Sequence, residues 1–402
     1  MKILIATHSL DGYTGSETFS YTLAVALQGL GEKVTCFSPI IGPLAKKLRE
    51  AGVCVVDDLS AVSDEIDVIH AQHRHETMLA YARFPNKPMI VVCHGVLPDE
   101  EQPFTPALNI FSYVAVSEEV KEHLALKHHI DPNRIAIIRN GIDFRRFYCR
   151  KPINPKPKRI LVLSNYMGEA QLSVIRELAE IYKLDLDKIG FPDRAVWNVE
   201  DYINDADIVI GLGRGALEAM ACKRIVLVHD YNGGDGLITP HNLEALQRRN
   251  FSGRTNRIAF DVEGLASEIA AYNPDMVDAV FDLVRRDYDI DIVARQYLNL
   301  YRESIRNINA KDRDSPAQLV LGSGYLVARS VLRELQNAKN TVKERESLIS
   351  IRDKQLRDVQ QVLELRDKQL SEVRNSISWR YTAPFRVLRR LLVNVGSKFR
   401  GK

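Results

Sequence analysis

The chain has 402 residues, which is enough for two globular domains and a further segment. Its formal net charge of +3 is too close to balance to indicate a nucleic-acid-binding protein. No run of about 18 apolar residues predicts a membrane span, and the apolar start is too short for a signal peptide. Without a C-x-x-C pair, the scattered cysteines predict reduced cytosolic thiols rather than zinc or disulfides: Cys36, Cys54, Cys93, Cys149 and Cys222.

Short apolar runs alternate with helical patterns through residues 1–150. Strands are expected at 2–7, 31–37, 53–56, 67–70, 89–94, 113–117 and 135–138, and helices after residue 16, at 44–51 and at 118–127. This alternation predicts a parallel, doubly wound sheet, which binds ligands at the carboxyl ends of its strands. That edge would bring together Gly12, Thr14 and Gly15, which follow the first strand, and His94, which ends a later one.

His94 precedes a glycine at a strand end, so it is a candidate catalytic residue. The alternative is a structural histidine whose ring is hydrogen-bonded. His70, His73 and His75 raise the question of a metal, but the loop adds no carboxylate beyond Glu76. We therefore expect no metal site.

A proline-rich linker at 151–158 begins a second domain, which is expected to reach residue 310. Strands are expected at 159–164, at 208–210 and at 224–229, and a short, weak strand is expected to end at 189–191. Helices are expected at 170–182, 199–206, 216–222, 243–250, 262–272 and 291–306. Two α/β domains joined by a linker enclose a cleft, which is the usual place for a ligand.

A glycine-rich turn between a strand and a helix is the main candidate site. It passes through Gly211, Gly213 and Gly215, and the helix that follows, from Ala216 to Cys222, consists of good helix formers. The N-terminus of a helix presents unpaired N–H groups to an anion. Arg214 could grip a phosphate there, and Glu218, one helical turn later, could accept hydrogen bonds from two ribose hydroxyls. The alternative is a tight turn with a surface Arg–Glu pair.

Five segments of the chain resemble GT-B glycosyltransferases of the large retaining nucleotide-sugar class, and they occur in the family's order. They are residues 12–17, 23–27, 94–95, 140–143 and 218–222. The resemblance covers about residues 1–310. It implies two Rossmann-like domains, a sugar nucleotide bound mainly by the second domain, no metal and no cofactor besides the nucleotide-sugar substrate. It further implies Glu218 on the ribose, the glycine turn at the diphosphate, His94 near the donor sugar, and the loop from Gly12 to Gly15 closing over the phosphates.

The chain departs from that family at two places. The family has a glutamate eight positions before Glu218, where this chain has Ile210. It also has an Arg and a Lys soon after the first strand of the second domain, where residues 164–169 contain neither. Our hypothesis is that Arg214 supplies the missing positive charge.

Two other segments have competing interpretations. The loop 233–242 follows a strand, so the residues from Gly236 to Asn242 are candidate contacts for the donor sugar or the acceptor; the alternative is a plain surface loop. Asp185 and Asp187 form a D-x-D match, which would indicate metal-bound nucleotide in the other glycosyltransferase architecture, but acids in such a position are commonly solvated.

The range 311–378 is expected to be a linker and a coiled-coil helix. Apolar residues recur at every seventh position: Leu335, Val342, Ile349, Leu356, Leu363, Leu370 and Ile377. The second row of the heptad pattern, at positions 338, 345, 352, 359, 366 and 373, is half apolar and includes arginines. This composition favours weak association of the helices; the alternative is a single solvated helix. The sequence Arg-Asp-Lys-Gln-Leu occurs twice, at 352–356 and at 366–370, which are two heptads apart.

The range 379–402 is expected to be a basic amphipathic tail. From residue 373 on, the chain has basic residues and no acid, interleaved with aromatic and aliphatic side chains. This composition fits an anionic membrane surface, and the stretch 376–384 resembles a tail of bacterial surface-polysaccharide glycosyltransferases. The alternative is packing on a partner protein or nucleic acid.

We therefore expect a metal-independent, retaining glycosyltransferase that moves a sugar from a nucleotide sugar to a lipid-linked or growing glycan in bacterial surface polysaccharide biosynthesis. Its expected location is cytoplasmic, peripheral at the inner face of the plasma membrane, with homo-oligomer formation through the coiled coil and no nucleic-acid partner. Two alternatives remain: a catalytically impaired nucleotide-sugar-binding scaffold, and a GT-B-like nucleotide-sugar epimerase.

Overall fold

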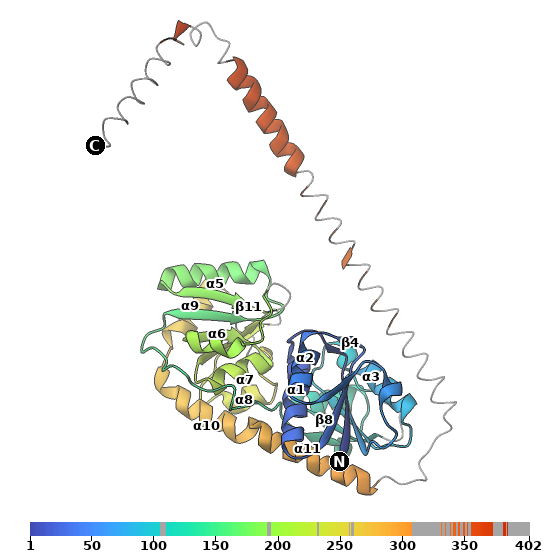
Figure 1. The fold of residues 1–402 in the computed structure, drawn as a ribbon. Helices are drawn as coiled ribbons and strands as arrows, with labels where there is room; N and C mark the ends of the chain where they lie inside the picture. Colours follow the sequence, from blue (N-terminus) through green and yellow to red (C-terminus); the bar gives the residue numbers. More distant parts are fainter. Residues whose placement is uncertain are drawn as a thin grey trace, which may run out of the picture. The chain divides into compact units, whose positions relative to one another are not determined.

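A computed structural model describes residues 1–307, except 105–109, 191–193, 231–232, 257 and 259–260. Beyond residue 330 it describes 355–372 and the single positions 331, 334, 338, 341, 342, 345, 349, 352, 381, 382 and 384. The chain divides into two units, Met1–Leu326 and Val327–Lys402, and the first unit contains both large sheets (Figure 1).

The first sheet has seven parallel strands in the order β5-β3-β1-β6-β7-β8-β9. Its strands are β1 (Lys2–Ala6), β3 (Lys33–Phe37), β5 (Cys54–Val56), β6 (Val68–Ala71), β7 (Met89–Cys93), β8 (Ile110–Ala115) and β9 (Ile135–Ile137). A small separate pair joins β2 (Ser9–Leu10) to β4 (Ile40–Ile41). The central strands are buried on both faces, as a sheet covered by helices requires.

The helices between the strands of the first lobe, by which we mean the seven-stranded sheet and its cover, begin at a glycine, a proline and two charged residues. They are α1 (Gly15–Gly29), α2 (Pro43–Glu50), α3 (Arg74–Arg83) and α4 (Glu118–Lys127), with short 3₁₀ turns η1 (Leu59–Ala61), η2 (Asp99–Glu101) and η3 (Pro132–Arg134). Pro43 opens α2, where its missing N–H costs nothing. Ser117 caps α4 by accepting a hydrogen bond from the Val120 N–H.

The second lobe is built on a five-stranded sheet in the order β11-β10-β12-β13-β14. Four strands are parallel: β10 (Arg159–Leu163), β11 (Asp185–Ile189), β12 (Ile208–Gly211) and β13 (Ile225–Asp230); β14 (Gly233–Leu237) is antiparallel to β13. The expectation of a loop at 233–237 is therefore wrong. These residues form the edge strand β14, paired antiparallel with β13, and Gly233 and Gly236 in it have positive φ.

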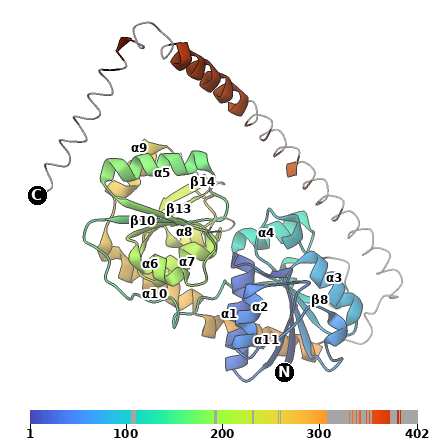
Figure 2. The same ribbon diagram turned by 45° about the horizontal axis from the view of Figure 1, so that its top comes forward.

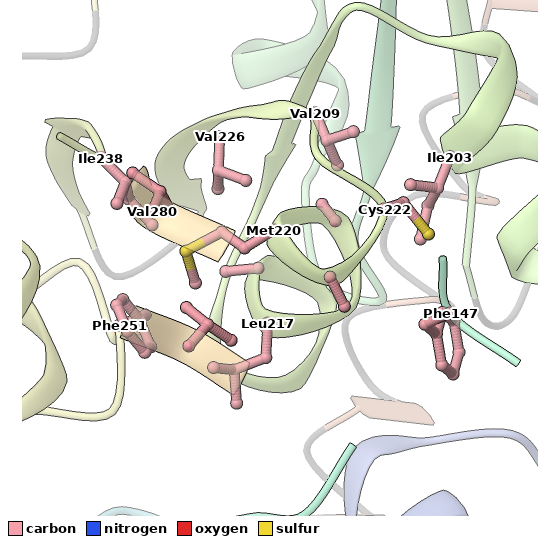
Figure 3. Packing of buried hydrophobic residues seen from close by; sticks show 14 of the residues in the cluster. Phe147, Ile203, Val209, Leu217, Met220, Cys222, Val226, Ile238, Phe251 and Val280 are labelled. Atoms are coloured by element: carbon pink, nitrogen blue, oxygen red, sulfur yellow. The ribbon is translucent and has the colours of Figure 1, made fainter. Parts of the chain in front are cut away.

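The helices of the second lobe are α5 (Glu169–Tyr182), α6 (Val199–Asp205), α7 (Gly213–Ala221), α8 (Leu243–Gln247), α9 (Val262–Ala270) and α10 (Val277–Tyr288), with η4 (Pro274–Met276) before the last. Figure 3 shows the buried side chains around α7, where Leu217 and Met220 belong to one apolar cluster with Val209 of β12 and Val226 of β13. This packing fixes the start of α7 relative to the carboxyl edge of the sheet.

The last helix of this unit, α11 (Ile290–Asn307), follows the second lobe in sequence but packs on the first. It lies alongside α1 in both ribbon views (Figures 1 and 2), and it also contacts β6 and β7. The Tyr301 hydroxyl lies 2.7 Å from His70 Nδ1 at the end of β6. The range 151–310, expected from the sequence to be one domain, thus includes a helix that returns to the first lobe.

The prediction of two Rossmann-like α/β lobes followed by a helical region is confirmed. In the second unit, residues 355–372 are helical and their apolar side chains are exposed. Positions 335 and 377 of the heptad row, the linker expected at 309–316 and nearly all of the basic tail lie outside the described residues. Among the residues that the structure describes, no helix is long and apolar enough to cross a membrane.

Candidate functional site

A cavity of about 250 Å³ opens at the start of two helices, one from each lobe. Tyr13, Gly15 and Thr18 line it from α1 and the loop before it, and Leu212, Arg214, Gly215 and Glu218 line it from α7. The remaining wall comes from Arg146 and Phe147, residues 163–166, 189–190, 195–197 and 199, and Asp230. Both helix N-termini direct positive partial charge toward the cavity, which favours an anion.

Contacts within the protein and backbone conformation explain why glycine occupies positions 211, 213 and 215, at the turn that leads into α7. A Cβ at Gly211 would lie 2.9 Å from the Leu163 carbonyl oxygen, and one at Gly215 would lie 3.0 Å from Leu163 Cδ2. Gly213 has a φ of +51°, and its N–H donates to the Phe251 carbonyl. Close approach to Leu163 of β10 at Gly211 and Gly215, and the positive φ of Gly213, therefore account for this glycine pattern before any ligand is considered.

Gly15 differs, because no atom lies within 4 Å of the Cβ it would carry. It begins α1 and lines the cavity, so its missing side chain keeps space open in front of the helix N-terminus. Neither protein packing nor a positive φ requires glycine at this position. Gly15 is thus the glycine whose position points most directly to a bound group.

The loop before Gly15 is organised by Glu17. Its carboxylate accepts hydrogen bonds from the Gly12 N–H at 3.3 Å, the Thr14 N–H at 3.0 Å and the Thr14 hydroxyl at 3.0 Å. A Cβ at Gly12 would lie 2.8 Å from a Glu17 oxygen. Of the predicted residues in this loop, the structure places Gly15 in the cavity wall, while Gly12 and Thr14 shape the loop around Glu17.

Arg214 lies in the cavity wall with a nearly buried side chain. Its Nε is 2.8 Å from Glu218 Oε1, and its two terminal nitrogens donate to the Gly141 carbonyl at 3.0 Å and the Thr22 hydroxyl at 2.9 Å. Burial raises the pKa of Glu218, and the positive charge of Arg214 opposes that shift. Arg214 and Glu218 are therefore together, as predicted, and the guanidinium also joins the two lobes.

A second cation in the cavity wall is Arg146, which the sequence analysis did not single out. It lies over the Trp197 ring, 4.1 Å from its centroid, and donates to Glu200 Oε2 at 2.8 Å and to the Trp197 carbonyl. Tyr13 and Tyr21 of the first lobe pack on the same ring, with centroids 5.4 and 5.0 Å away. Arg146 follows the predicted motif at 140–143 by three residues, which was the available signal.

The stretch after β10, which lacks the family's Arg and Lys, forms one end of the cavity. The Ser164 hydroxyl donates to Asp230 Oδ2 at 2.7 Å and accepts from the N–H groups of Tyr166 and Met167. Asp230 ends β13 on the same sheet edge. This end of the cavity is polar and carries a buried carboxylate instead of a cation.

His94 lines a second cavity of about 170 Å³, on the other side of Leu212 and Gly213. Burial lowers the pKa of His94 to about 3; the charges of His73 and Arg214 act in the same direction, and a hydrogen bond with the Asn140 side chain opposes the shift. Its Nε2 lies 3.0 Å from Gln72 Oε1, and Phe19 packs edge-on against the ring. His94 is thus a neutral imidazole with a protein hydrogen bond, located at the interlobe cavity.

The loop 249–254 forms the opposite wall of this second cavity. Arg254 makes a bidentate pair with Glu119 of α4, at 2.6 and 3.2 Å, which links the lobes again. Asn250 Oδ1 and Ser252 Oγ are buried in this wall, and neither has a hydrogen-bond partner among the described residues. Unpaired buried polar atoms beside a cavity are suited to a polar ligand or to water.

The side chain of Asn242, predicted to contact the donor sugar or the acceptor, forms hydrogen bonds within its own turn. Its amide donates to the Leu237 carbonyl and accepts from the Thr239 N–H, both at 2.8 Å. It lines neither of the two cavities. Asp185 and Asp187 of the D-x-D match lie in edge strand β11, where they pair with Arg159 and Arg194. Within the described ranges, no three His, Cys, Asp or Glu side chains form a metal-binding group.

Comparison with known proteins identifies the architecture. Residues 59–146 match the model of the family described as Glycosyltransferase Family 4. No curated protein matches the chain. A glycosyltransferase structure from Rickettsia africae is 18% identical, with a TM-score of 0.52, over 76% of this chain and 99% of that one.

Anabaena HepE in complex with UDP and glucose is 12% identical, with a TM-score of 0.54, over 75% of this chain and 100% of its own. The structure of AviGT4, a glycosyltransferase involved in avilamycin A biosynthesis, is 14% identical, with a TM-score of 0.50, over 76% and 98%. These similarities show that the two lobes have the GT-B glycosyltransferase fold.

Proposed function

We propose that this protein is a glycosyltransferase that moves a sugar from a nucleotide-sugar donor to a lipid-linked or growing glycan, with retention and without a metal ion. The match to Glycosyltransferase Family 4 and the GT-B fold support the transferase class. HepE, which shares the fold, was solved with UDP and glucose, and this supports a nucleotide-sugar donor. The proposed setting is bacterial surface polysaccharide assembly at the inner face of the plasma membrane.

One observation carries the donor assignment: the N-termini of α1 and α7 open onto the same cavity of about 250 Å³. A diphosphate there would receive N–H donors from both lobes, with Arg146 and Arg214 in the surrounding wall. Residues 195–197 and 199, which include Trp197, supply apolar surface for a nucleoside. Glu218 lies within reach of the same cavity, where a ribose hydroxyl would compete with Arg214 for its oxygens.

The proposed transfer breaks the bond from the anomeric carbon to the diphosphate oxygen and forms one to an acceptor hydroxyl oxygen, whose proton passes to the departing diphosphate. The departing diphosphate gains negative charge, and fixed N–H dipoles and buried cations stabilise that charge without reorganising. We assign no enzymic nucleophile. Of the carboxylates at the cavity, Glu218 is paired with Arg214, and Asp230 accepts from Ser164.

A catalytically impaired scaffold is the second candidate, and Ile210 favours it. This residue takes the place of the family glutamate, lies in the middle of β12 and is fully buried. It faces the apolar core that includes Ile160 and Leu227 rather than a cavity. Donor binding without turnover is the behaviour expected of such a protein.

The test begins with calorimetric titration of the full chain against nucleoside diphosphates and their sugars, followed by a transfer assay with the donor that binds. Product on a lipid-linked acceptor supports the transferase. Binding without any product supports the scaffold, and a changed sugar on the free nucleotide supports an epimerase. Flat titrations with every nucleoside diphosphate would refute the donor site itself.

Association through the helical region is also part of the proposal. Leu356, Leu363 and Leu370 are spaced by seven residues, and each is more than half exposed in the described helix. Paired helices would cover this row. Light scattering of the full chain should show a dimer or larger species, and Leu363→Lys should shift it toward monomer. A monomeric wild-type chain at high concentration would contradict association.

Membrane binding by the basic tail is a separate part of the proposal and rests on sequence. Flotation with vesicles containing anionic lipid should carry the full chain, and removal of 374–402 should abolish it. Neutral vesicles are the control, because basic residues need anionic lipid. Equal flotation with and without the tail would remove this role.

A further inference from the structure

A chain of buried hydrogen bonds leads from His94 into the first lobe. His94 Nε2 lies 3.0 Å from Gln72 Oε1, and Gln72 Nε2 lies 2.8 Å from the Ser20 hydroxyl oxygen. Gln72 follows β6 and His94 follows β7, which are neighbouring parallel strands. Gln72 and Ser20 are 1% and 0% exposed, so water does not compete for these bonds.

The direction of these hydrogen bonds follows from Ser20. Its hydroxyl oxygen lies 2.9 Å from the Ser16 carbonyl, one turn earlier in α1, and a carbonyl can only accept. The contact with the Thr7 hydroxyl is longer, at 3.4 Å. The single hydrogen of Ser20 therefore goes to Ser16. Ser20 must then accept from Gln72, so the NH₂ group of Gln72 faces Ser20 and its oxygen faces His94.

We propose that Gln72, oriented by Ser20, is a positioning residue that fixes His94 as the neutral tautomer with its proton on Nε2. An amide oxygen can only accept, so the ring nitrogen opposite it must carry hydrogen. Burial independently disfavours the imidazolium form and outweighs the hydrogen bond with the Asn140 side chain, which favours it. Nδ1 is then left with its lone pair.

This tautomer decides what His94 can bind. Nδ1 can only accept, so a protein or ligand group that hydrogen-bonds it must be a donor, such as an amide N–H or a sugar hydroxyl. A deprotonated phosphate oxygen is excluded as its partner. The ligand part of this statement rests on the proposed function, whereas the tautomer is a property of the free protein.

The test is made without substrate. The full chain is labelled with ¹⁵N at its ten histidines, and long-range ¹H–¹⁵N correlation spectra are recorded near neutral pH. His94→Gln identifies the signals of His94. We expect a protonated Nε2 and an unprotonated Nδ1. Signals of the Nδ1–H tautomer, or of an imidazolium, would overturn the proposal whether or not the protein transfers sugar.

Variants of Gln72 and Ser20 test whether Gln72 sets the tautomer of His94 or only fills space beside it. Gln72→Leu should give a mixture of the two tautomers, and Ser20→Ala should do so partly, because the amide is then free to turn. Gln72→Glu should keep Nε2 protonated and make His94 titrate at higher pH, since a carboxylate stabilises the imidazolium.

Gln28→Leu is the matched control in the same lobe, because Gln28 bonds only to the Gly52 carbonyl in the described contacts. It should leave the His94 signals unchanged. An unchanged tautomer in a folded Gln72→Leu protein would show that Gln72 only fills space. If that variant does not fold, the wild-type spectrum and Gln72→Glu still decide the matter.

Discussion

The guanidinium of Arg214, at the start of α7, donates to the Thr22 hydroxyl of α1 at 2.9 Å. The same side chain pairs with Glu218 and reaches the carbonyl of Gly141. The helix start proposed to hold a diphosphate is therefore also a contact between the lobes. The proposed binding at this cavity and one of the contacts between the lobes therefore involve the same buried cation.

Replacing Arg214 by Met should weaken both folding and donor binding. It leaves the buried Glu218 carboxylate without its partner, which costs about 3–5 kcal/mol in comparable buried pairs. The double variant with Glu218→Met should recover much of that stability, because no buried charge remains. Urea unfolding measures the first effect and calorimetric titration with the nucleoside diphosphate the second. Wild-type donor affinity in Arg214→Met would refute the role of Arg214 in binding.

Gly15→Ala should fold normally and bind the nucleotide more weakly. The added methyl meets no protein atom within 4 Å and projects where the cavity approaches the α1 N-terminus. A tenfold loss of affinity would correspond to about 1.4 kcal/mol. Gly29→Ala is the matched control, since it also has open space but lies at the other end of α1. Equal affinities for the two variants would show that no ligand approaches Gly15.

Glu101→Gln should change how stability depends on pH. Burial raises the pKa of Glu101 to about 7, and the neighbouring charge of Glu100 adds to the effect. The folded protein then holds a proton that the unfolded chain releases near its ordinary pKa of about 4.3. Stability from this group is full below that pH and is lost as pH rises toward 7.

A pKa raised from about 4.3 to about 7 corresponds to a loss of roughly 3–4 kcal/mol, and Glu101→Gln should remove it. Urea unfolding at pH 5 and pH 8 provides the comparison. The variant should gain stability relative to wild type at pH 8 and change little at pH 5. The same difference between variant and wild type at both pH values would show that Glu101 titrates normally.

Tyr301→Phe should loosen α11 from the first lobe. It leaves His70 Nδ1 buried without the hydroxyl that lies 2.7 Å away, a loss of about 1–3 kcal/mol. Tyr297→Phe is the control on the same helix, because its hydroxyl is buried without a partner in the described part of the chain. That substitution should be neutral or slightly stabilising. Thermal unfolding that ranks the two variants in the opposite order would contradict this account.

Local pattern was sufficient to predict the alternating strands and helices of both lobes. Buried parallel strands are short, continuous apolar runs, so β1, β7, β12 and β13 stand out in the sequence. The helix α10 was missed although Val277, Val280 and Val284 have helical spacing and are buried. The strand β14 was missed because its glycines resemble a loop, while its pairing with β13 is a long-range contact.

For the site, the sequence by itself determined which helix starts and strand ends meet at one edge, since parallel α/β connectivity leaves little choice. It also paired Arg214 with Glu218, because residues four apart share a helix face. Only the tertiary structure decided that Arg214 reaches Thr22, that Arg146 stacks on Trp197, that Gln72 faces His94 and that Asn242 closes its own turn. Each of these contacts joins side chains whose distance depends on how two packed elements meet, and no local periodicity specifies that distance.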